Sequence, residues 1–358
     1  MIDAEIIALR LQNQQFAHTG FNTPADLVKW LGATQAQDYA AAKWAIGLRM
    51  QGGTDEDIDR SFNNGSILRT HVLRPTWHFV APEDIRWIIA LTAPRVKAQC
   101  AFMNRKMELN EAIFKQCNKT IIKALKGNQY LTRPELREIL QKTGVAVNDF
   151  RLTYIMLRAE LDAVVCSGPR KGKQFTYSLL EERVPESTEY KKEEALAMLA
   201  LRYFASRGPA MLQDFVWWSG LATADAKRGL EIVAPKLQKE TINEKIYWYQ
   251  DVAKASKAFT KMTYLLPNYD EYIVAYKDRL LIFDPEKFQK NPGRNVIFNH
   301  TIVIDGKVTG TWKRTIMKDK VIIEPITFIK LIKAQKKSIA GAADNYSAFL
   351  GLSAEINW

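Results

Sequence analysis

The sequence of 358 residues contains only three cysteines and four histidines, so two common sources of metal and redox chemistry are scarce. Cys100, Cys117 and Cys166 are odd in number and show no C-x-x-C spacing, which argues against a disulfide framework and against a zinc ribbon. His71 and His78 lie seven residues apart on a segment predicted to be extended, where they would point to opposite faces of a strand unless a turn intervenes. We therefore expect no metal and no other cofactor, and a location in the reducing cytoplasm.

Long apolar runs and nucleotide-binding motifs are also missing. No apolar stretch approaches the ~20 residues needed to cross a bilayer, and the N-terminal MIDAEIIALR is acidic, unlike a secretion signal. The segment GPRKGKQ lacks the spacing of a phosphate-binding P-loop, and no G-x-G-x-x-G follows a predicted strand. Ser61, Ser167 and Ser219 lie in no nucleophile-elbow sequence. These absences disfavour membrane association, nucleotide hydrolysis, dinucleotide chemistry and serine-hydrolase chemistry.

Positive charge is present in excess. Lys and Arg number 51 against 39 Asp and Glu, which gives a formal charge of +12 and favours a polyanionic partner such as nucleic acid. Residues 95–126 carry eight Lys or Arg and two Glu, residues 169–173 add three cations, and residues 307–337 carry nine cations against two acids. Each run alone is typical of the solvated face of a basic helix. Three separate runs favour a DNA-binding function.

The middle of the chain predicts three helices and a hairpin. Helical patterns cover residues 111–126, 131–144 and 148–165, with Thr132 as the cap of the second helix. Residues 164–179 then predict two strands joined by a turn with a Gly-Pro-basic tip. Three helices followed by a two-stranded wing form the plan of a winged helix-turn-helix module.

Related patterns flank this segment. Helices and then strands are predicted over residues 2–81 and again over residues 194–250, whereas strand-like runs at 261–276, 279–284 and 294–326 precede a Lys-rich helix at 326–343. We therefore predict an α+β fold with about three tandem winged helix-turn-helix modules and a small C-terminal β-rich module. The expected divisions are 1–100, 101–185, 190–258 and 259–358.

The segment LGATQAQDYAAAKW places two glutamines around one small residue. On a helix, Gln35 and Gln37 would diverge by about 200°, whereas in an extended segment they share a face while Ala36 turns inward. A joint function therefore requires a segment that is not helical. The candidate cap Thr34 allows this, with the helix starting near Asp38 or Tyr39. Taken alone, the pair is also explained as solvent-facing linker glutamines.

A second motif, RTHVLRPTWHFV, mixes cations with hydroxyl, imidazole and aromatic groups. Such a strand can border a cleft that binds nucleic acid, where arginine contacts a phosphate and an aromatic ring stacks on a base. The alternative is an amphipathic strand whose apolar side chains fill a core, and for Trp77 we favour that alternative. The residues predicted to contact DNA are Arg69, His71 and Arg74 in this motif, Arg170, Lys171 and Lys173 at the hairpin tip, and Lys313 and Arg314 near the C-terminus.

Several of these segments together resemble one family. Five segments resemble, in their order and spacing, the AlkZ/YcaQ-type winged-helix DNA glycosylases. They are the stretch from Leu31 to Arg49, LRTHVLRPTWHFV, LQDFVWWSGL, LLPNYDEYIVAYKDR and VIDGKVTGTWKR. The resemblance implies tandem winged helices around duplex DNA and hydrolysis of the N-glycosidic bond of N-alkylated purines or alkyl crosslinks. The catalytic signature of that family is glutamine, an aliphatic residue, then glutamine or aspartate. Gln35, Ala36 and Gln37 match its two-glutamine form.

The chemistry is compatible with an uncharged pair. N7-alkylguanine already carries a positive charge, so the base leaves without protonation and the enzyme needs only to orient water and stabilise the developing sugar cation. Glutamine carbonyls can accept hydrogen bonds from that water. We expect Asp38 to cap a helix, and we assign packing and salt bridging rather than chemistry to the other acidic and aromatic residues of the family-like segments: Asp214, Trp217, Trp218, Asp270, Glu271, Lys277 and Arg279.

The sequence thus predicts a monofunctional DNA glycosylase that acts as a monomer on duplex DNA with alkylated bases. A non-catalytic winged-helix DNA-binding protein, such as a transcriptional regulator, is the alternative. Such regulators usually form dimers on two half-sites and show sequence preference. RNA binding is a third possibility, and it would appear as a preference for single strands.

Overall fold

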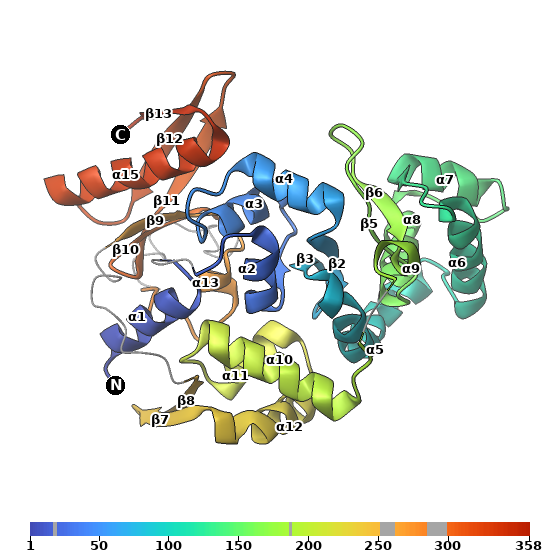
Figure 1. Ribbon diagram of the computed structural model, residues 1–358, viewed down its shortest axis with the longest axis horizontal. Coiled ribbons are helices and arrows are strands. Elements are labelled where there is room, and N and C mark those ends of the chain that lie inside the picture. The colour runs from blue at the N-terminus through green and yellow to red at the C-terminus, as the bar shows by residue number, and fades with distance from the viewer. Residues whose placement is uncertain (17–19, 186–187, 251–261, 285–298) are drawn as a thin grey trace.

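The computed structural model describes residues 1–16, 20–185, 188–250, 262–284 and 299–358. Helices and strands are both abundant, which confirms the α+β class. Figure 1 shows a larger body and a lobe made of α6–α9 with β4–β6, joined to the body through α5 (Pro82–Lys106). No helix in the described part of the chain is both long and apolar enough to span a membrane.

The N-terminal region contains four helices before its strand pair. They are α1 (Asp3–Asn13), α2 (Pro24–Leu31), α3 (Tyr39–Gly47) and α4 (Asp55–Asn64), with the short strand β1 (Thr34–Gln35) between α2 and α3. The hairpin of β2 (Leu68–Val72) and β3 (Thr76–Val80) follows, and the sheet order is β1-β3-β2 with antiparallel pairing. The prediction of Thr34 as a helix cap is wrong, because this residue pairs with Phe79 in the sheet. The cap of α3 is Asp38, whose side chain accepts the N–H of Ala41.

The lobe repeats this order of elements. After α5 come α6 (Glu111–Leu125), β4 (Leu131–Thr132), α7 (Arg133–Gln141), α8 (Asp149–Leu161), β5 (Val165–Ser167), β6 (Thr176–Leu179) and the short α9 (Leu180–Arg183). The sheet order β4-β6-β5 is equivalent to that of the first sheet. Thr132 caps α7 in a capping box with Glu135, as the sequence predicts.

A third set of elements lies along the bottom of the view in Figure 1. It comprises α10 (Lys192–Arg207), α11 (Leu212–Ser219), α12 (Thr223–Val233), the single turn η1 (Ala234–Lys236), and the hairpin of β7 (Gln238–Ile242) and β8 (Lys245–Tyr249). An isolated bridge between Ala210 and Trp248 takes the place that the short strand has in the other two sets. The order of helices and then strands predicted for residues 194–250 is confirmed.

The C-terminal region forms a five-stranded sheet of order β13-β12-β11-β10-β9. Its elements are β9 (Thr263–Leu266), the one-turn helix α13 (Glu271–Val274), β10 (Thr301–Ile304), β11 (Lys307–Ile316), β12 (Lys320–Thr327), α15 (Lys333–Leu350) and β13 (Ser353–Ile356). Only β12 and β13 run parallel among the described pairs. Part of the strand-like run at 294–326 lies outside the described residues.

Two expectations for this region are wrong. Residues 279–284 form a turn rather than a strand, with Leu280 two-thirds exposed and Ile282 buried. The Lys-rich helix begins at Lys333, because the preceding residues up to Thr327 continue β12. Hydrophobicity alone predicted both elements, and an apolar run is compatible with a strand, a helix or a buried turn.

The core of the N-terminal region is completed by the C-terminal sheet. One buried cluster unites Ala36 and Phe79 with Ile302, Trp312 and Tyr346, and the indole N–H of Trp44 donates to the carbonyl of Leu265 at 2.7 Å. A second cluster joins β2 to α10, α11 and the segment after α13. The Gln35–Gln37 segment therefore lies where the N-terminal, third and C-terminal sets of elements meet.

Candidate functional site

The backbone of the Gln35–Gln37 segment is extended. Gln35 pairs with His78 across β1 and β3, and the N–H of Ala36 donates to the carbonyl of Trp77 at 2.7 Å. Ala36 is completely buried, as its inward position in the predicted pattern requires. The condition that the sequence set for a joint function of the two glutamines, a segment that is not helical, is thus met.

The two glutamine side chains differ in exposure and are linked to each other. Gln35 is 8% exposed, and its carbonyl oxygen accepts the backbone N–H of Gln37 at 2.9 Å. Gln37 is exposed, and its carbonyl oxygen accepts the N–H of Trp77 at 3.4 Å. Because each amide oxygen has a second lone pair, both can still accept a hydrogen bond from water. The segment therefore offers two amides whose orientation is set by the backbone.

A buried carboxylate anchors the segment from the other side. Oε1 of Glu271 accepts the N–H of Gln35 at 3.0 Å. Its Oε2 accepts Nη2 of Arg207 at 2.7 Å and the indole N–H of Trp218 at 3.0 Å, and all three side chains are almost completely buried. Arg207 also donates to the carbonyls of Leu31 and Ala33. The salt-bridging role predicted for Glu271 is confirmed, and its contact with Gln35 is an addition.

Asp38 connects the segment to the C-terminal sheet. One of its oxygens caps α3, and the other accepts the side-chain amide of Asn268 at 3.4 Å. The N–H of Asn268 donates to Nδ1 of His300 at 2.9 Å, and Nε2 of that ring contacts the Arg314 guanidinium. Burial, reinforced by Arg314, lowers the pKa of His300 to about 4. Arg314 is thus linked through His300 and Asn268 to Asp38, the residue that follows Gln37.

Arg69 holds the segment from the β2 side. Its Nε donates to the carbonyl of Ala36 at 2.9 Å and its Nη2 to that of Gln37 at 3.3 Å. The guanidinium lies 4.3 Å from the ring centroid of Trp77 and 4.8 Å from that of Phe175. Burial lowers its pKa to about 10, so it remains charged at neutral pH. In this structure Arg69 fixes the glutamine backbone, and its contact with DNA remains a prediction.

The other predicted residues of the second motif are also largely enclosed. Nδ1 of His71 lies 2.6 Å from Oε2 of Glu160, a buried residue of α8. Arg74 is half-buried, and its guanidinium lies 5.8 Å from the ring centroid of Trp217. Burial lowers the pKa of Arg74. These contacts show packing roles for His71 and Arg74.

The cations at the β5–β6 hairpin tip fall into two groups. Arg170 is tied to the N-terminal region, since its N–H donates to Oδ1 of Asn63 at 2.8 Å and its guanidinium lies 3.7 Å from Asp59. Lys171 is exposed and pairs with Glu135 at 2.7 Å. Lys173 is exposed, as is Lys313 on β11. The last three are accessible to a polyanion in this structure, whereas Arg170 joins the hairpin to the body.

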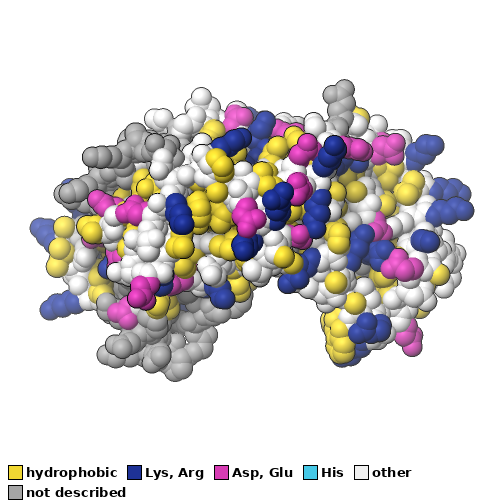
Figure 2. Space-filling view, turned by 90° about the horizontal axis from the view of Figure 1, so that it is seen from below, with side chains coloured by type: hydrophobic (Ala, Val, Ile, Leu, Met, Phe, Trp, Pro, Cys, Tyr) yellow, Lys and Arg dark blue, Asp and Glu magenta, His cyan; other side chains and the backbone are white. Residues whose placement is uncertain are grey.

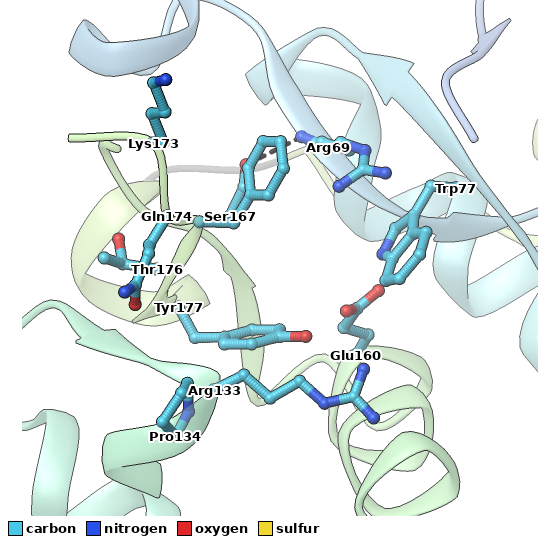
Figure 3. A pocket seen from close by; sticks show the side chains of 11 residues that line it. Arg69, Trp77, Arg133, Pro134, Glu160, Ser167, Lys173, Gln174, Thr176 and Tyr177 are labelled. Atoms are coloured by element: carbon cyan, nitrogen blue, oxygen red, sulfur yellow. Dashed lines mark hydrogen bonds between the residues drawn. The ribbon is translucent and has the colours of Figure 1, made fainter. Parts of the chain in front are cut away.

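A pocket of about 330 Å³ lies between β2–β3 and the lobe. Its walls include Arg69 and Trp77 from the first sheet and Glu160, Lys173 and Tyr177 from the lobe (Figure 3). Figure 2 shows, at the lower edge of the molecule, a hollow between the lobe and the larger body, with Lys and Arg side chains gathered where the two join. Of the three accessible cations, Lys173 lines the pocket.

Sequence reasoning missed Asn268, His300 and Glu160 as partners of the candidate residues. Each lies far along the chain from its contact, as the 230 residues between Asp38 and Asn268 illustrate. The only available signal was the presence of polar residues within otherwise apolar runs. That signal identifies a buried polar residue but not its partner.

Cysteine and metal chemistry have little support in the described residues. All three cysteines are free and buried, and burial raises the pKa of Cys117 to about 11 and that of Cys166 to about 12. Among the described residues no group of three or more histidine, cysteine, aspartate or glutamate side chains is arranged to hold a metal ion. The absence of a cofactor remains a prediction.

The burial of His78 predicts how the free energy of unfolding depends on pH. Its Nδ1 lies 2.9 Å from the carbonyl of Thr76, its Nε2 is buried without a hydrogen-bond partner among the described residues, and burial lowers its pKa to about 3. Between pH 6.5 and about 3 the unfolded chain binds a proton at this residue that the folded chain does not. Unfolding free energy should therefore be highest above pH 6.5 and fall by about 1.4 kcal/mol per pH unit below it.

Urea unfolding at pH 7, 6 and 5 tests this prediction. The variant His78→Phe keeps a ring at the site without a titratable group, so its stability should depend on pH less steeply, by about one proton. Equal slopes for the variant and the natural chain would contradict the assignment to His78.

Comparisons with known proteins extend over nearly the whole chain. A family model described as DNA glycosylase AlkZ-like matches residues 28–349. An interstrand DNA cross-link repair glycosylase of Streptomyces sahachiroi is 22% identical over 378 aligned positions, which cover 95% of each sequence. The solved structure of the Streptomyces sahachiroi DNA glycosylase AlkZ matches with a TM-score of 0.79 and 18% identity, covering 99% of each chain. The structural match supports the fold.

Proposed function

Because the chain belongs to the family of AlkZ-like DNA glycosylases, we propose that it hydrolyses the N-glycosidic bond of cationic N-alkylated purines in duplex DNA, with Gln35 and Gln37 positioning the water. The observation that carries the proposal is the extended Gln35–Gln37 segment, in which both amide oxygens accept backbone N–H groups. Side chains held in this way need little reorganisation during the reaction.

The chemistry assigns different tasks to the two glutamines. The exposed amide of Gln37 can accept a hydrogen bond from a water molecule and orient it toward the sugar carbon. The less exposed Gln35 fixes the N–H of Gln37 and presents its own amide to the same region. Since an N7-alkylated purine leaves as a neutral base, the departing group needs no acid. A purine crosslink with the same cationic linkage belongs to the proposed substrate class.

The proposal includes the mode of DNA binding. The repeated order of helix, short strand, two helices and hairpin supports three winged-helix modules, with the divisions predicted from the sequence. Lys171, Lys173 and Lys313 are accessible cations that would contact the DNA backbone. We also propose that the protein acts as a monomer, because a lesion can occur anywhere and does not require the two-fold symmetry of a palindromic site. The proposed location is the cytoplasm.

A base-release experiment tests this function. The protein is incubated with a duplex that carries one N7-methylguanine, and alkali then converts abasic sites into strand breaks. Cleavage should occur at the modified position and be absent from the unmodified duplex. Size measurement of the complex should show one protein chain per duplex.

The alternative function has different outcomes in the same experiment. A non-catalytic DNA-binding protein would retain the duplex without releasing the base, and it would bind as a dimer with sequence preference. Binding without strand breaks after prolonged incubation would therefore overturn the glycosylase proposal.

A further inference from the structure

The pocket between β2–β3 and the lobe lies next to the candidate site but is not lined by either glutamine. Its volume of about 330 Å³ is at the lower end for small-molecule sites in proteins. Three aromatic residues, Trp77, Phe175 and Tyr177, contribute to its walls. Walls of this kind favour a flat, unsaturated ring, because aromatic faces stack on nucleobases.

A buried carboxylate faces this pocket with one oxygen available. Glu160 is 1% exposed, and the hydrogen bonds it accepts among the described residues, from Thr70 and His71, all end on Oε2. Glu160 nevertheless lines the pocket, which leaves Oε1 to meet an occupant. Oε1 is accessible within the pocket, so a ligand that brings a donor can take the place of water there.

Tyr177 adds a second polar group. Its side chain is largely buried, and no hydrogen bond to its hydroxyl occurs among the described residues. Figure 3 shows this hydroxyl pointing across the pocket toward Trp77 and Glu160. The carboxylate and hydroxyl thus face the same space from one side of the aromatic wall.

The opening of the pocket carries positive charge. Lys173 is exposed and lines the pocket. The guanidinium of Arg133 donates to neutral oxygens of Asp149 and Thr153, so its charge is not neutralised by these contacts. Figure 3 shows Lys173 and Arg133 on opposite sides of the pocket, so a phosphate group would contact one of them, and the exposed Lys173 is the more accessible.

We propose that this pocket binds a guanine deoxynucleotide, with the base against the aromatic wall and the phosphate near Lys173. Guanine presents two adjacent donors, N1–H and the exocyclic amine, and Oε1 of Glu160 can accept from either of them. Adenine has an acceptor at N1 in place of the first donor, so Glu160 would select against it. The Tyr177 hydroxyl can donate to the carbonyl oxygen of guanine.

This proposal rests on the proposed function only in assigning the natural nucleotide to DNA; the pocket itself is tested with free nucleotides. Calorimetric titration of the full chain with dGMP, dAMP and inorganic phosphate at low salt separates the contributions. We expect dGMP to bind at least about tenfold more tightly than dAMP, because the loss of one hydrogen bond to a charged acceptor typically costs at least this factor. Phosphate alone should bind more weakly than dGMP.

Three variants locate the binding. Glu160→Gln should remove the preference for dGMP over dAMP, and Tyr177→Phe, which preserves the ring, should weaken dGMP binding several-fold. Lys173→Ala should weaken binding of dGMP but not of deoxyguanosine. The matched control Tyr130→Phe changes an exposed tyrosine outside the pocket and should leave binding unchanged.

Equal affinity for dGMP and dAMP, or no dGMP binding at millimolar concentration, would overturn the proposal. A dGMP affinity that Tyr177→Phe and Lys173→Ala both leave intact would also do so, and these two variants do not depend on the buried Glu160–His71 pair. The base-release experiment is run in parallel on the same preparations. Base release without nucleotide binding would contradict only the proposal for the pocket. Nucleotide binding without base release would contradict only the proposed catalytic function.

Discussion

Replacing both Gln35 and Gln37 with alanine should slow the release of N7-methylguanine from duplex DNA by at least about 100-fold. The reason is that the double variant removes both amides proposed to orient water, and removal of one preorganised hydrogen-bonding group from an active site typically costs a factor of this size. The measurement is single-turnover base release, which isolates the chemical step from product dissociation. Affinity for undamaged duplex should change by no more than about twofold.

The single variants add a sharper test. Because the carbonyl oxygen of Gln35 accepts the N–H of Gln37, the two losses should not add, and the double variant should be little slower than the slower single variant. Gln51→Ala is the matched control, since Gln51 is an exposed glutamine outside the segment, and its rate should equal that of the natural chain. Undiminished release by both Gln35→Ala and Gln37→Ala would refute the catalytic assignment.

Glu271→Ala should lower the free energy of unfolding by about 3–5 kcal/mol. The substitution leaves the buried guanidinium of Arg207 without its carboxylate and removes the acceptor of the Gln35 N–H and the Trp218 indole. Urea unfolding followed by circular dichroism at pH 7 measures the change.

An exposed pair provides the comparison. Glu355 pairs with Lys320 at 2.6 Å, but its side chain is 52% exposed, so Glu355→Ala should cost no more than about 1 kcal/mol. Losses of equal size at the two positions would show that the carboxylate of Glu271 does not stabilise the fold in the way its burial implies.

Local features of the candidate site could be predicted from the sequence. The alternation around Ala36 indicated an extended segment because a buried alanine between two polar residues fits a strand-like period. Asp38 was predicted as a helix cap, and the structure confirms it. Thr34 is an equally good cap by residue type, and pairing with Phe79 in a sheet decided between the two.

Partners distant in the sequence could not be predicted. Glu271 and Gln35 are 236 residues apart, and no periodicity within either segment encodes their contact. Asp270 and Glu271 were expected on a strand, yet Asp270 caps the short helix α13, which turns Glu271 inward toward Arg207. The role of Arg69 also depended on tertiary structure, because an arginine on a basic strand fits a phosphate contact as well as it fits two backbone carbonyls.

The shared core has a consequence for how the chain folds during synthesis. Phe79 and Ala36 are covered by residues from Leu265 onward, including Trp312 and Phe349. The N-terminal set of elements therefore cannot complete its buried cluster until the residues up to Phe349 have been synthesised. Until then the glutamine segment lacks Glu271 and Asn268, so the candidate site is assembled only at the last stage of folding.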